Sequence, residues 1–131
     1  MEAEVRIPIR WRDVDAYGHV NNAVFLNYLE EARDRLVSSL FGDASWDFVV
    51  ARVAIDYRAE LSQSDGEAVV RCRVTGIGTS SVRTAEEVRK TDGTLAAEAA
   101  SVVVARNPET GTSRPLSDEE RATLQGAVEE V

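Results

Sequence analysis

The first segment of the chain alternates between apolar and charged side chains. Its apolar members are Val5, Ile7, Ile9 and Trp11, and its arginines are Arg6, Arg10 and Arg12. A period of two residues is typical of a strand with one buried face, because successive side chains of a strand point to opposite sides. The pattern therefore predicts an opening strand whose apolar face includes Trp11.

Apolar residues then recur every three or four positions, as they do along one side of an amphipathic helix. The set consists of Phe25, Leu29, Ala32, Leu36 and Leu40. Glu31 stands four residues before Arg35 on the polar side, where such a pair adds helical support. Gly42 is typical of the residue that follows a helix end, so the pattern predicts one long helix that ends there.

Strand periodicity returns in the second half of the chain. Alternation predicts four strands, over residues 51–61, 68–75, 79–90 and 95–106. The turn signals between them lie at residues 62–66, 76–78 and 91–94. The last turn contains Asp92-Gly93, which is typical of a hairpin. Ala97, Ala99 and Ser101 are small, so we expect the last strand to leave room for a close neighbour such as the helix.

Ser117 and Glu120 have the spacing of a capping box, which predicts the start of a second helix. That helix is weak, because Gly126 interrupts its apolar positions, and its end is expected to fray. Its apolar positions are Leu124, Ala127, Val128 and Val131. One long helix against one antiparallel sheet predicts an α+β domain.

Composition narrows the class of protein. A length of 131 residues fits one domain, 1–131, in which residues 116–131 form the terminal helix or tail. The formal net charge of −8 argues against a nucleic-acid partner, which generally needs a clustered basic face. No apolar run approaches the ~20 residues of a membrane span and the N-terminus is unlike a signal peptide, so we expect a cytoplasmic protein without a membrane partner. Cys72 is the only cysteine, so no intrachain disulfide can form, and its strand position favours a buried, inert thiol.

The connection between the first strand and the long helix, residues 13–22, concentrates the polar chemistry and holds the only histidine. Gly18 lets the backbone turn sharply, and Asn21 or Asn22 is suited to cap the helix. The unpaired N–H groups and the dipole of a helix start can stabilise an oxygen that gains negative charge. A carboxylate just upstream, at Asp15, can act as base or nucleophile, so the stretch suggests acyl transfer.

These residues resemble a known family. The motif Asp-x-x-Gly-His-Val-Asn-Asn begins at Asp15 and is followed after two residues by Phe-Leu-x-Tyr-Leu-Glu-Glu-Ala-Arg. It is similar to the hotdog-fold acyl-CoA thioesterases of the 4-hydroxybenzoyl-CoA thioesterase-like group, especially the long-chain acyl-CoA branch. The resemblance implies a hotdog fold, in which a five-stranded antiparallel sheet wraps around one long central helix. It also implies a homodimer or homotetramer with active sites at the subunit interface.

The resemblance further implies catalytic roles. Asp15 matches the catalytic carboxylate of the family; the alternative is a turn aspartate bonded to local backbone. The backbone N–H of Asn22 matches the donor that polarises the thioester carbonyl. His19 either positions Asp15, binds substrate or water, or acts as a base, or else it is a structural histidine of the turn. Asp13 does not match the family acid in position and is expected to support the loop.

Substrate binding is expected to involve Tyr17, Gly18 and Asn21 of the same loop, together with Ser80. Ser80 is expected on the fourth strand, where relatives often carry a serine or threonine near the acyl group or pantetheine arm; the alternative is an ordinary strand serine. Three arginines either meet CoA phosphates or are ordinary surface charges: Arg83, Arg89 and Arg106.

Two functions are compatible with these residues. The first is an acyl-CoA thioesterase, which hydrolyses the thioester of acyl-CoA or acyl-carrier protein to a free acid. The second is a noncatalytic hotdog protein that binds the same acyl thioesters. The presence of both the acid and the Gly-His-Val-Asn-Asn turn favours the enzyme. We expect no cofactor and no metal, and the chain has no Gly-x-Ser-x-Gly elbow of a serine hydrolase.

Overall fold

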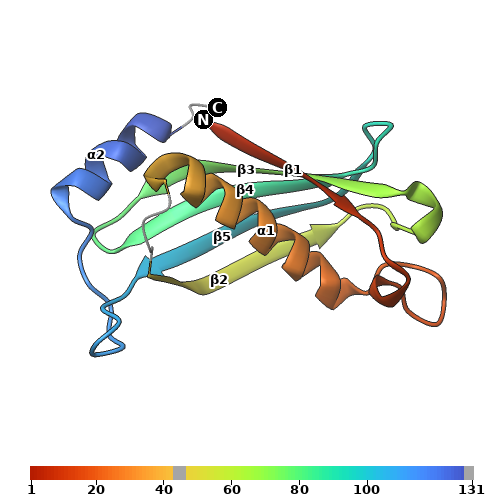
Figure 1. Ribbon diagram of the computed structural model, residues 1–131, viewed down its shortest axis with the longest axis horizontal. Coiled ribbons are helices and arrows are strands. Elements are labelled where there is room, and N and C mark those ends of the chain that lie inside the picture. The colour runs from red at the N-terminus through yellow and green to blue at the C-terminus, as the bar shows by residue number, and fades with distance from the viewer. Residues whose placement is uncertain (43–46, 129–131) are drawn as a thin grey trace.

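The computed structural model describes residues 1–42 and 47–128. Its elements follow the predicted order of strand, long helix, four strands and short helix (Figure 1). They are β1 (Glu2–Pro8), α1 (Asn22–Phe41), β2 (Phe48–Tyr57), β3 (Glu67–Ile77), β4 (Ser81–Arg89), β5 (Leu95–Ala105) and α2 (Asp118–Ala127). The predicted α+β class is therefore confirmed.

The five strands form one antiparallel sheet in the order β1-β3-β4-β5-β2. The long helix α1 crosses one face of this sheet and packs mainly on β1, β3 and β4 (Figure 1). Its buried side chains are Phe25, Tyr28, Leu29, Ala32 and Leu36, and Leu40 is half-buried. Full burial of one such large apolar side chain stabilises the fold by about 1.5–3 kcal/mol, so the predicted stripe holds α1 on the sheet.

Two predicted strand ends are wrong. Strand β1 stops at Pro8 and the chain makes a 3-10 turn over Trp11–Asp13, which leaves Trp11 78% exposed instead of on a buried face. Arg10 fixes this turn, because both its backbone N–H and its side chain donate to the Asp13 carboxylate. Strand β2 begins at Phe48 and ends at Tyr57, and the residues up to 61 form a connection rather than strand.

A buried ion pair joins α1 to the sheet. Arg33 Nη1 lies 3.2 Å from Glu86 Oε1 of β4, and the two side chains are 11% and 0% exposed. The hydroxyls of Thr84 and Ser101 donate to the same carboxylate at 2.9 and 3.1 Å. Arg33 of α1 also donates a hydrogen bond to Ser101 Oγ of β5 at 3.3 Å. Ser101 is one of the small residues that were expected to lie close to the helix, and this hydrogen bond joins it to α1.

The short helix α2 begins with the predicted capping box. Ser117 Oγ accepts from the Glu120 backbone N–H, and the Glu120 carboxylate accepts from the Ser117 N–H. Arg114 also donates two hydrogen bonds to that carboxylate, and its side chain lowers the pKa of Glu120 to about 2. The helix continues through Gly126 to Ala127, whereas the predicted apolar position Val131 lies outside the described residues.

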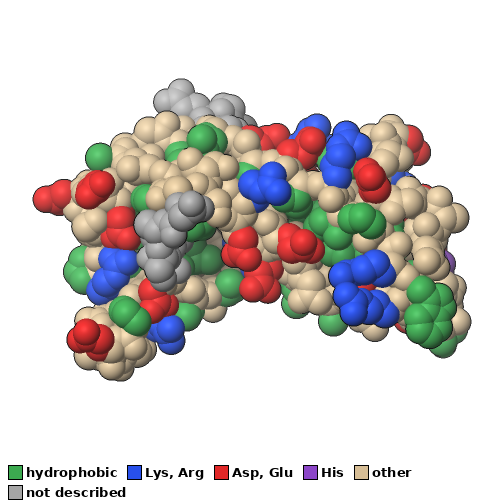
Figure 2. Space-filling model, in the orientation of Figure 1, with side chains coloured by type: hydrophobic (Ala, Val, Ile, Leu, Met, Phe, Trp, Pro, Cys, Tyr) green, Lys and Arg blue, Asp and Glu red, His purple; other side chains and the backbone are tan. Residues whose placement is uncertain are grey.

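The surface carries the acidic excess of the chain unevenly. Figure 2 shows acidic side chains over the middle of α1, where Glu30, Glu31 and Asp34 are exposed.

None of the described helices has both the length and the apolarity to cross a membrane. Cys72 lies buried in β3, and this burial raises the pKa of its thiol, which keeps the group protonated and unreactive.

Candidate active site at the start of the central helix

Asp13 is the structural centre of the loop before α1. It is only 3% exposed, and its Oδ2 accepts hydrogen bonds from the Arg10 backbone, the Arg10 side chain and the Tyr28 hydroxyl at 3.1, 3.2 and 2.9 Å. Burial opposes ionisation of Asp13, but these hydrogen bonds outweigh it and lower the pKa of the carboxyl. The Asp13 carbonyl also accepts from the Asn21 N–H at 2.9 Å. Asp13 therefore ties the exit of β1 to the start of α1, which fits the expected support role.

Beyond Asp13 the chain forms a small hairpin, in which Val14 and Val20 make an antiparallel bridge. Asp15 N–H donates to the His19 carbonyl at 2.8 Å, and Gly18 N–H donates to the Asp15 carbonyl at 3.1 Å. Gly18 has φ +84°, a left-handed conformation that is strained for other residue types, so the predicted turn requires this glycine.

The Asp15 carboxylate has one engaged and one free oxygen. Its Oδ1 accepts from the backbone N–H groups of Tyr17 and His19 at 2.9 and 3.3 Å. Within residues 1–42 and 47–128, no protein donor bonds to its Oδ2. The contacts to Oδ1 fix the orientation of the side chain, and Oδ2 remains able to take a proton or attack a carbon.

Helix α1 begins as predicted with an asparagine cap, at Asn21. The side-chain oxygen of Asn21 accepts a hydrogen bond from the Ala23 N–H at 2.9 Å, and the backbone carbonyl of Asn21 accepts one from the Val24 N–H. In the described part of the chain, the N–H of Asn22 has no hydrogen-bond acceptor. It lies at the positive end of the helix dipole, so it is suited to bind an oxygen with negative charge.

These groups border one open pocket of about 280 Å³. Its lining consists of Asp15, His19, Val20, Asn22, Phe25, Tyr57, Arg58, Ala59, Glu60 and Leu61. The rings of Phe25 and Tyr57 meet edge to face with centroids 5.2 Å apart, and the Tyr57 hydroxyl donates to the Asn22 carbonyl at 3.0 Å. Asp15 and the first residue of the helix therefore line the same pocket, beside both apolar and charged side chains, and a carboxylate next to a free helix N–H is suited to attack on a carbonyl group.

The structure brings together most, but not all, of the predicted site residues. Asp15, His19 and Asn22 line the pocket, whereas Gly18 and Asn21 shape the backbone beside it. The Tyr17 side chain is 85% exposed and does not line the pocket, so its contribution within one chain is the N–H that orients Asp15.

The expected position of Ser80 is wrong. It lies in the turn before β4 rather than on that strand, and its carbonyl accepts from the N–H of Ala105. Tyr57 at the pocket pairs with Ala97, eight residues earlier on β5. Eight strand residues span roughly 27 Å, so Ser80 cannot reach the pocket of its own chain.

Sequence reasoning missed the wall formed by residues 57–61. Glu60 Oε2 lies 3.0 Å from His19 Nε2, and the Leu61 carbonyl accepts from the Val20 N–H at 2.7 Å. These residues are about 40 positions from the loop in the chain, and the alternating pattern assigned Glu60 only to the polar side of a strand. No local pattern in the sequence signals such a contact between distant residues.

Among the described residues, no group of three His, Cys, Asp or Glu side chains is arranged to hold a metal ion.

Comparison with known proteins bears on this site. Residues 9–124 match the model of a family described as the thioesterase-like superfamily. A thioesterase from Thermus thermophilus, solved in complex with coenzyme A and Zn, is 36% identical over 95% of this chain and 93% of its own, with a TM-score of 0.83. No curated protein matches the chain.

Other solved structures agree with that result. A predicted thioesterase from Bacillus stearothermophilus is 27% identical over 100% of this chain and 99% of its own, with a TM-score of 0.89. The PA2801 protein of Pseudomonas aeruginosa, a putative thioesterase, is 29% identical over 93% and 97%, with a TM-score of 0.81. The expected hotdog fold is confirmed, and the chain belongs to the thioesterase-like superfamily.

Proposed function

We propose that the protein is an acyl-CoA thioesterase and that the pocket at the start of α1 is its active site. The observation that carries the proposal is that the Asp15 carboxylate and the unpaired N–H of Asn22 border one pocket. The coenzyme A in the related Thermus thermophilus thioesterase supports a CoA thioester as substrate. Within the superfamily, the Asp15 to Arg33 motif favours the 4-hydroxybenzoyl-CoA thioesterase-like group and its long-chain branch.

In the proposed reaction the thioester carbonyl oxygen accepts a hydrogen bond from the Asn22 N–H. Asp15 then either removes a proton from the attacking water or attacks the carbonyl carbon itself. The oxygen gains negative charge as the carbon becomes tetrahedral, and the helix N-terminus stabilises it. One such donor contributes roughly 3–4 kcal/mol to lowering the barrier, and general base catalysis contributes roughly 10²- to 10⁴-fold. The carbon–sulfur bond then breaks and the CoA thiolate leaves. On the water route this gives the free acid, and the proton held by Asp15 passes to the thiolate; on the nucleophilic route it leaves a mixed anhydride on Asp15, which a water molecule hydrolyses to the free acid and the Asp15 carboxylate.

The other site residues have supporting roles in this proposal. His19 is held by Glu60 at 3.0 Å and borders the pocket, which places it to orient substrate or water beside Asp15. Gly18 and Asn21 hold the turn and the helix cap, and Tyr17 orients Asp15 through its N–H. Ser80 can contact substrate only where a second subunit brings it to the pocket.

One observation favours a second candidate function. Asp15 Oδ1 bonds to two local backbone N–H groups, which is the behaviour of an aspartate that only supports a turn. With Asp15 in that role, the pocket would bind acyl-CoA or acyl-carrier-protein thioesters without cleaving them.

Hydrolysis is expected with thioesters and not with simple oxygen esters that lack a pantetheine arm. A thiolate leaves without strong acid assistance, whereas this pocket offers neither an activated serine nor a buried acid for an alkoxide. The measurement is turnover of a matched pair, an acyl-CoA and the ethyl ester of the same acid. Equal rates for the two esters would refute the proposed chemistry.

We further infer a homodimer, because exposed apolar residues gather on the side of the molecule formed by α1 and β2. Leu26 of α1 is 42% exposed, and Val49, Val50 and Tyr57 of β2 are 40%, 48% and 43% exposed. Strand β2 is also an edge strand of the described sheet, and an edge strand can pair with a strand of another chain. Pairing of two such edges would cover these side chains and bring the two pockets to one interface.

Light scattering at micromolar concentration should therefore give the mass of at least two chains. Val50→Asp should shift the protein toward smaller species, because it places a charge on the apolar part of this edge. Arg35→Asp, an equally drastic change on the exposed side of α1, is the matched control. A wild-type protein that stays monomeric would contradict the inferred dimer.

A further inference from the structure

Trp11 is one of the two most exposed large hydrophobic side chains in the described part of the chain. It is 78% exposed and Tyr17 is 85% exposed, whereas every other such side chain is at most 49% exposed. Both stand in the connection between β1 and α1 that also carries Asp15. Trp11 differs from Tyr17 because it stands between two arginines, Arg10 and Arg12. Tryptophan combines a large apolar ring with an N–H group and is enriched at binding surfaces, so this exposed ring suggests a ligand.

The backbone around Trp11 is held in place by its neighbours. The backbone N–H and the Nε of Arg10 both donate to the Asp13 carboxylate, which fixes the 3-10 turn Trp11–Asp13. In the described part of the chain, the two Nη groups of Arg10 have no acceptor. Arg12 is exposed and forms no ion pair within residues 1–42 and 47–128. Figure 2 shows basic side chains beside hydrophobic ones over the turn that follows β1 in Figure 1.

A ring between two guanidinium groups is suited to a particular class of ligand. A guanidinium offers two parallel N–H donors to two oxygens of one phosphate, which makes arginine a preferred phosphate ligand. An aromatic side chain stacks on the flat face of a nucleobase. The turn therefore fits a ligand that carries both phosphate groups and a base.

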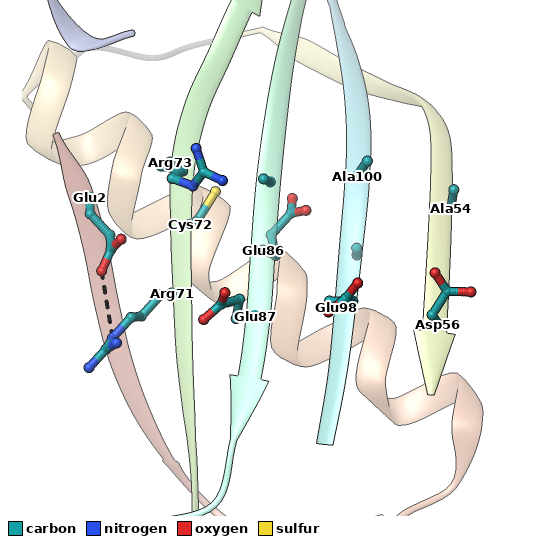
Figure 3. A pocket seen from close by; sticks show the side chains of 12 residues that line it. Glu2, Ala54, Asp56, Arg71, Cys72, Arg73, Glu86, Glu87, Glu98 and Ala100 are labelled. Carbon is teal, nitrogen blue, oxygen red and sulfur yellow. Dashed lines mark ion pairs between the residues drawn. The ribbon is translucent and has the colours of Figure 1, made fainter. Parts of the chain in front are cut away.

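The outer face of the sheet is less suited to bind phosphate. It holds a hollow of about 360 Å³ that three acids border: Asp56, Glu87 and Glu98 (Figure 3). Arg71 at this hollow lies 3.5 Å from Glu2 (Figure 3) and 2.9 Å from Glu4. Arg83 shares the outer face with Glu87, because alternate residues of a strand point to one side. The acids on this face repel phosphate.

Two more arginines that the sequence offered for CoA phosphates are held by acids. Arg89 Nε lies 3.0 Å from Glu87 Oε2, and Arg106 Nη2 lies 3.0 Å from Asp47 Oδ1. A phosphate would have to compete with these carboxylates. The Nη groups of Arg10 and the guanidinium of Arg12 have no such competitor among the described residues.

The Trp11 turn lies close to the candidate active site. Trp11 and Arg12 stand four and three residues before Asp15 in the chain. A chain spans at most about 3.6 Å per residue, so the Cα atoms of Trp11 and Asp15 lie no more than roughly 14 Å apart. A CoA thioester bound at Asp15 extends its pantetheine arm out of the open pocket, and this arm ends in a diphosphate, a phosphorylated ribose and adenine. The nucleotide end is thus within reach of the turn.

We propose that the Trp11 turn binds the nucleotide end of CoA. Adenine stacks on the Trp11 ring, and the Arg12 guanidinium and the Arg10 Nη groups donate to phosphate oxygens. This inference rests on the proposed function and narrows its substrate class to CoA thioesters. A carrier-protein thioester brings the same pantetheine arm but no adenine, so it gains nothing from Trp11.

Calorimetry with free CoA and with pantetheine tests the proposal. Wild-type protein should bind CoA more tightly than pantetheine, because only CoA reaches the turn. Trp11→Ala should raise the dissociation constant for CoA at least about fivefold, and Arg12→Ala about two- to fivefold, while the affinity for pantetheine stays the same. Added salt should weaken the binding of CoA in the wild type more than in Arg12→Ala, because salt screens the contact between arginine and phosphate.

Two control variants accompany this measurement. Trp11→Phe keeps a flat ring and should retain most of the affinity for CoA. Arg35→Ala removes an arginine from the exposed side of α1 and should leave the affinity unchanged. Thermal melts establish that each variant is folded, and Arg12→Ala provides a separate test if Trp11→Ala unfolds the chain.

Three results would overturn the proposal. The first is wild-type protein that binds CoA no more tightly than pantetheine, or folded Trp11→Ala and Arg12→Ala variants that bind CoA as the wild type does. The second is a lower mass of Trp11→Ala in light scattering, which would place the ring in a subunit contact. The third is loss of binding to vesicles of anionic phospholipid with unchanged affinity for CoA, which would assign the turn to a membrane surface. Binding of CoA needs no turnover, so Trp11-dependent binding without thiol release would refute the proposed hydrolysis and leave this inference standing.

Discussion

Replacement of Asp15 by asparagine is expected to lower acyl-CoA hydrolysis by roughly 100-fold or more, while folding and acyl-CoA binding persist. Asparagine keeps an oxygen that can accept from the Tyr17 and His19 N–H groups, so the turn should retain its shape. It cannot take a proton or attack as an anion, so only the transition state loses stabilisation, by about 2.7 kcal/mol or more for a 100-fold effect. The measurement is kcat from release of free CoA thiol, with binding measured separately by calorimetry.

Asp13→Asn is the comparison variant. Asp13 accepts three hydrogen bonds and is not among the residues that line the pocket, so its loss should lower the stability of the loop more than the chemistry of the folded protein. If Asp15→Asn kept near-normal turnover while Asp13→Asn or His19→Ala abolished it, the catalytic role would belong to that other residue.

Removal of the buried arginine on α1 should cause the largest loss of stability. Arg33→Met would leave the Glu86 carboxylate, which is 0% exposed, without a cation. Breaking a buried pair on one side typically costs about 3–5 kcal/mol, because an uncompensated charge stays buried. Methionine preserves most of the side-chain volume, so a cavity contributes little. Urea denaturation gives the change in the free energy of unfolding.

Two further variants identify the cause of that loss. Arg35→Met on the exposed side of the same helix should change the free energy of unfolding by about 0.5 kcal/mol or less. Arg33→Met/Glu86→Gln removes both charges and should recover a large part of the lost stability. A single variant as stable as the wild type, or a double variant no better than the single, would argue against a charge effect.

The sequence was most informative where the pattern was local. The apolar stripe from Phe25 to Leu36, the asparagine cap and the Asp92-Gly93 hairpin all depend on neighbours within a few positions, and the structure confirms them. Trp11 was misplaced because the alternating pattern continued past Pro8, while the Asp13 carboxylate turned the chain instead. A side-chain hydrogen bond outweighed the periodicity there.

The candidate site was predictable only on its loop side. Asp15, His19 and Asn22 come from one continuous motif, so the resemblance located them together. Tyr57 and Glu60 line the same pocket from the end of β2 and the connection after it, about 40 residues further along the chain. Their place in the pocket follows from the position at which β2 ends, which the sequence pattern put four residues too late. Ser80 lies at the opposite end of the sheet from this pocket, which a position in the chain order could not reveal, and its contact with substrate stays a prediction that requires a second subunit.

The most direct measurement is release of free thiol by the wild-type protein from a panel of acyl-CoAs of increasing chain length, with aromatic acyl groups included. We predict sustained turnover of at least one member, at a rate that Asp15→Asn reduces roughly 100-fold or more without loss of binding. Saturable binding of acyl-CoA with no thiol release across the whole panel would contradict it and would identify the protein as a noncatalytic acyl-binding member of the superfamily.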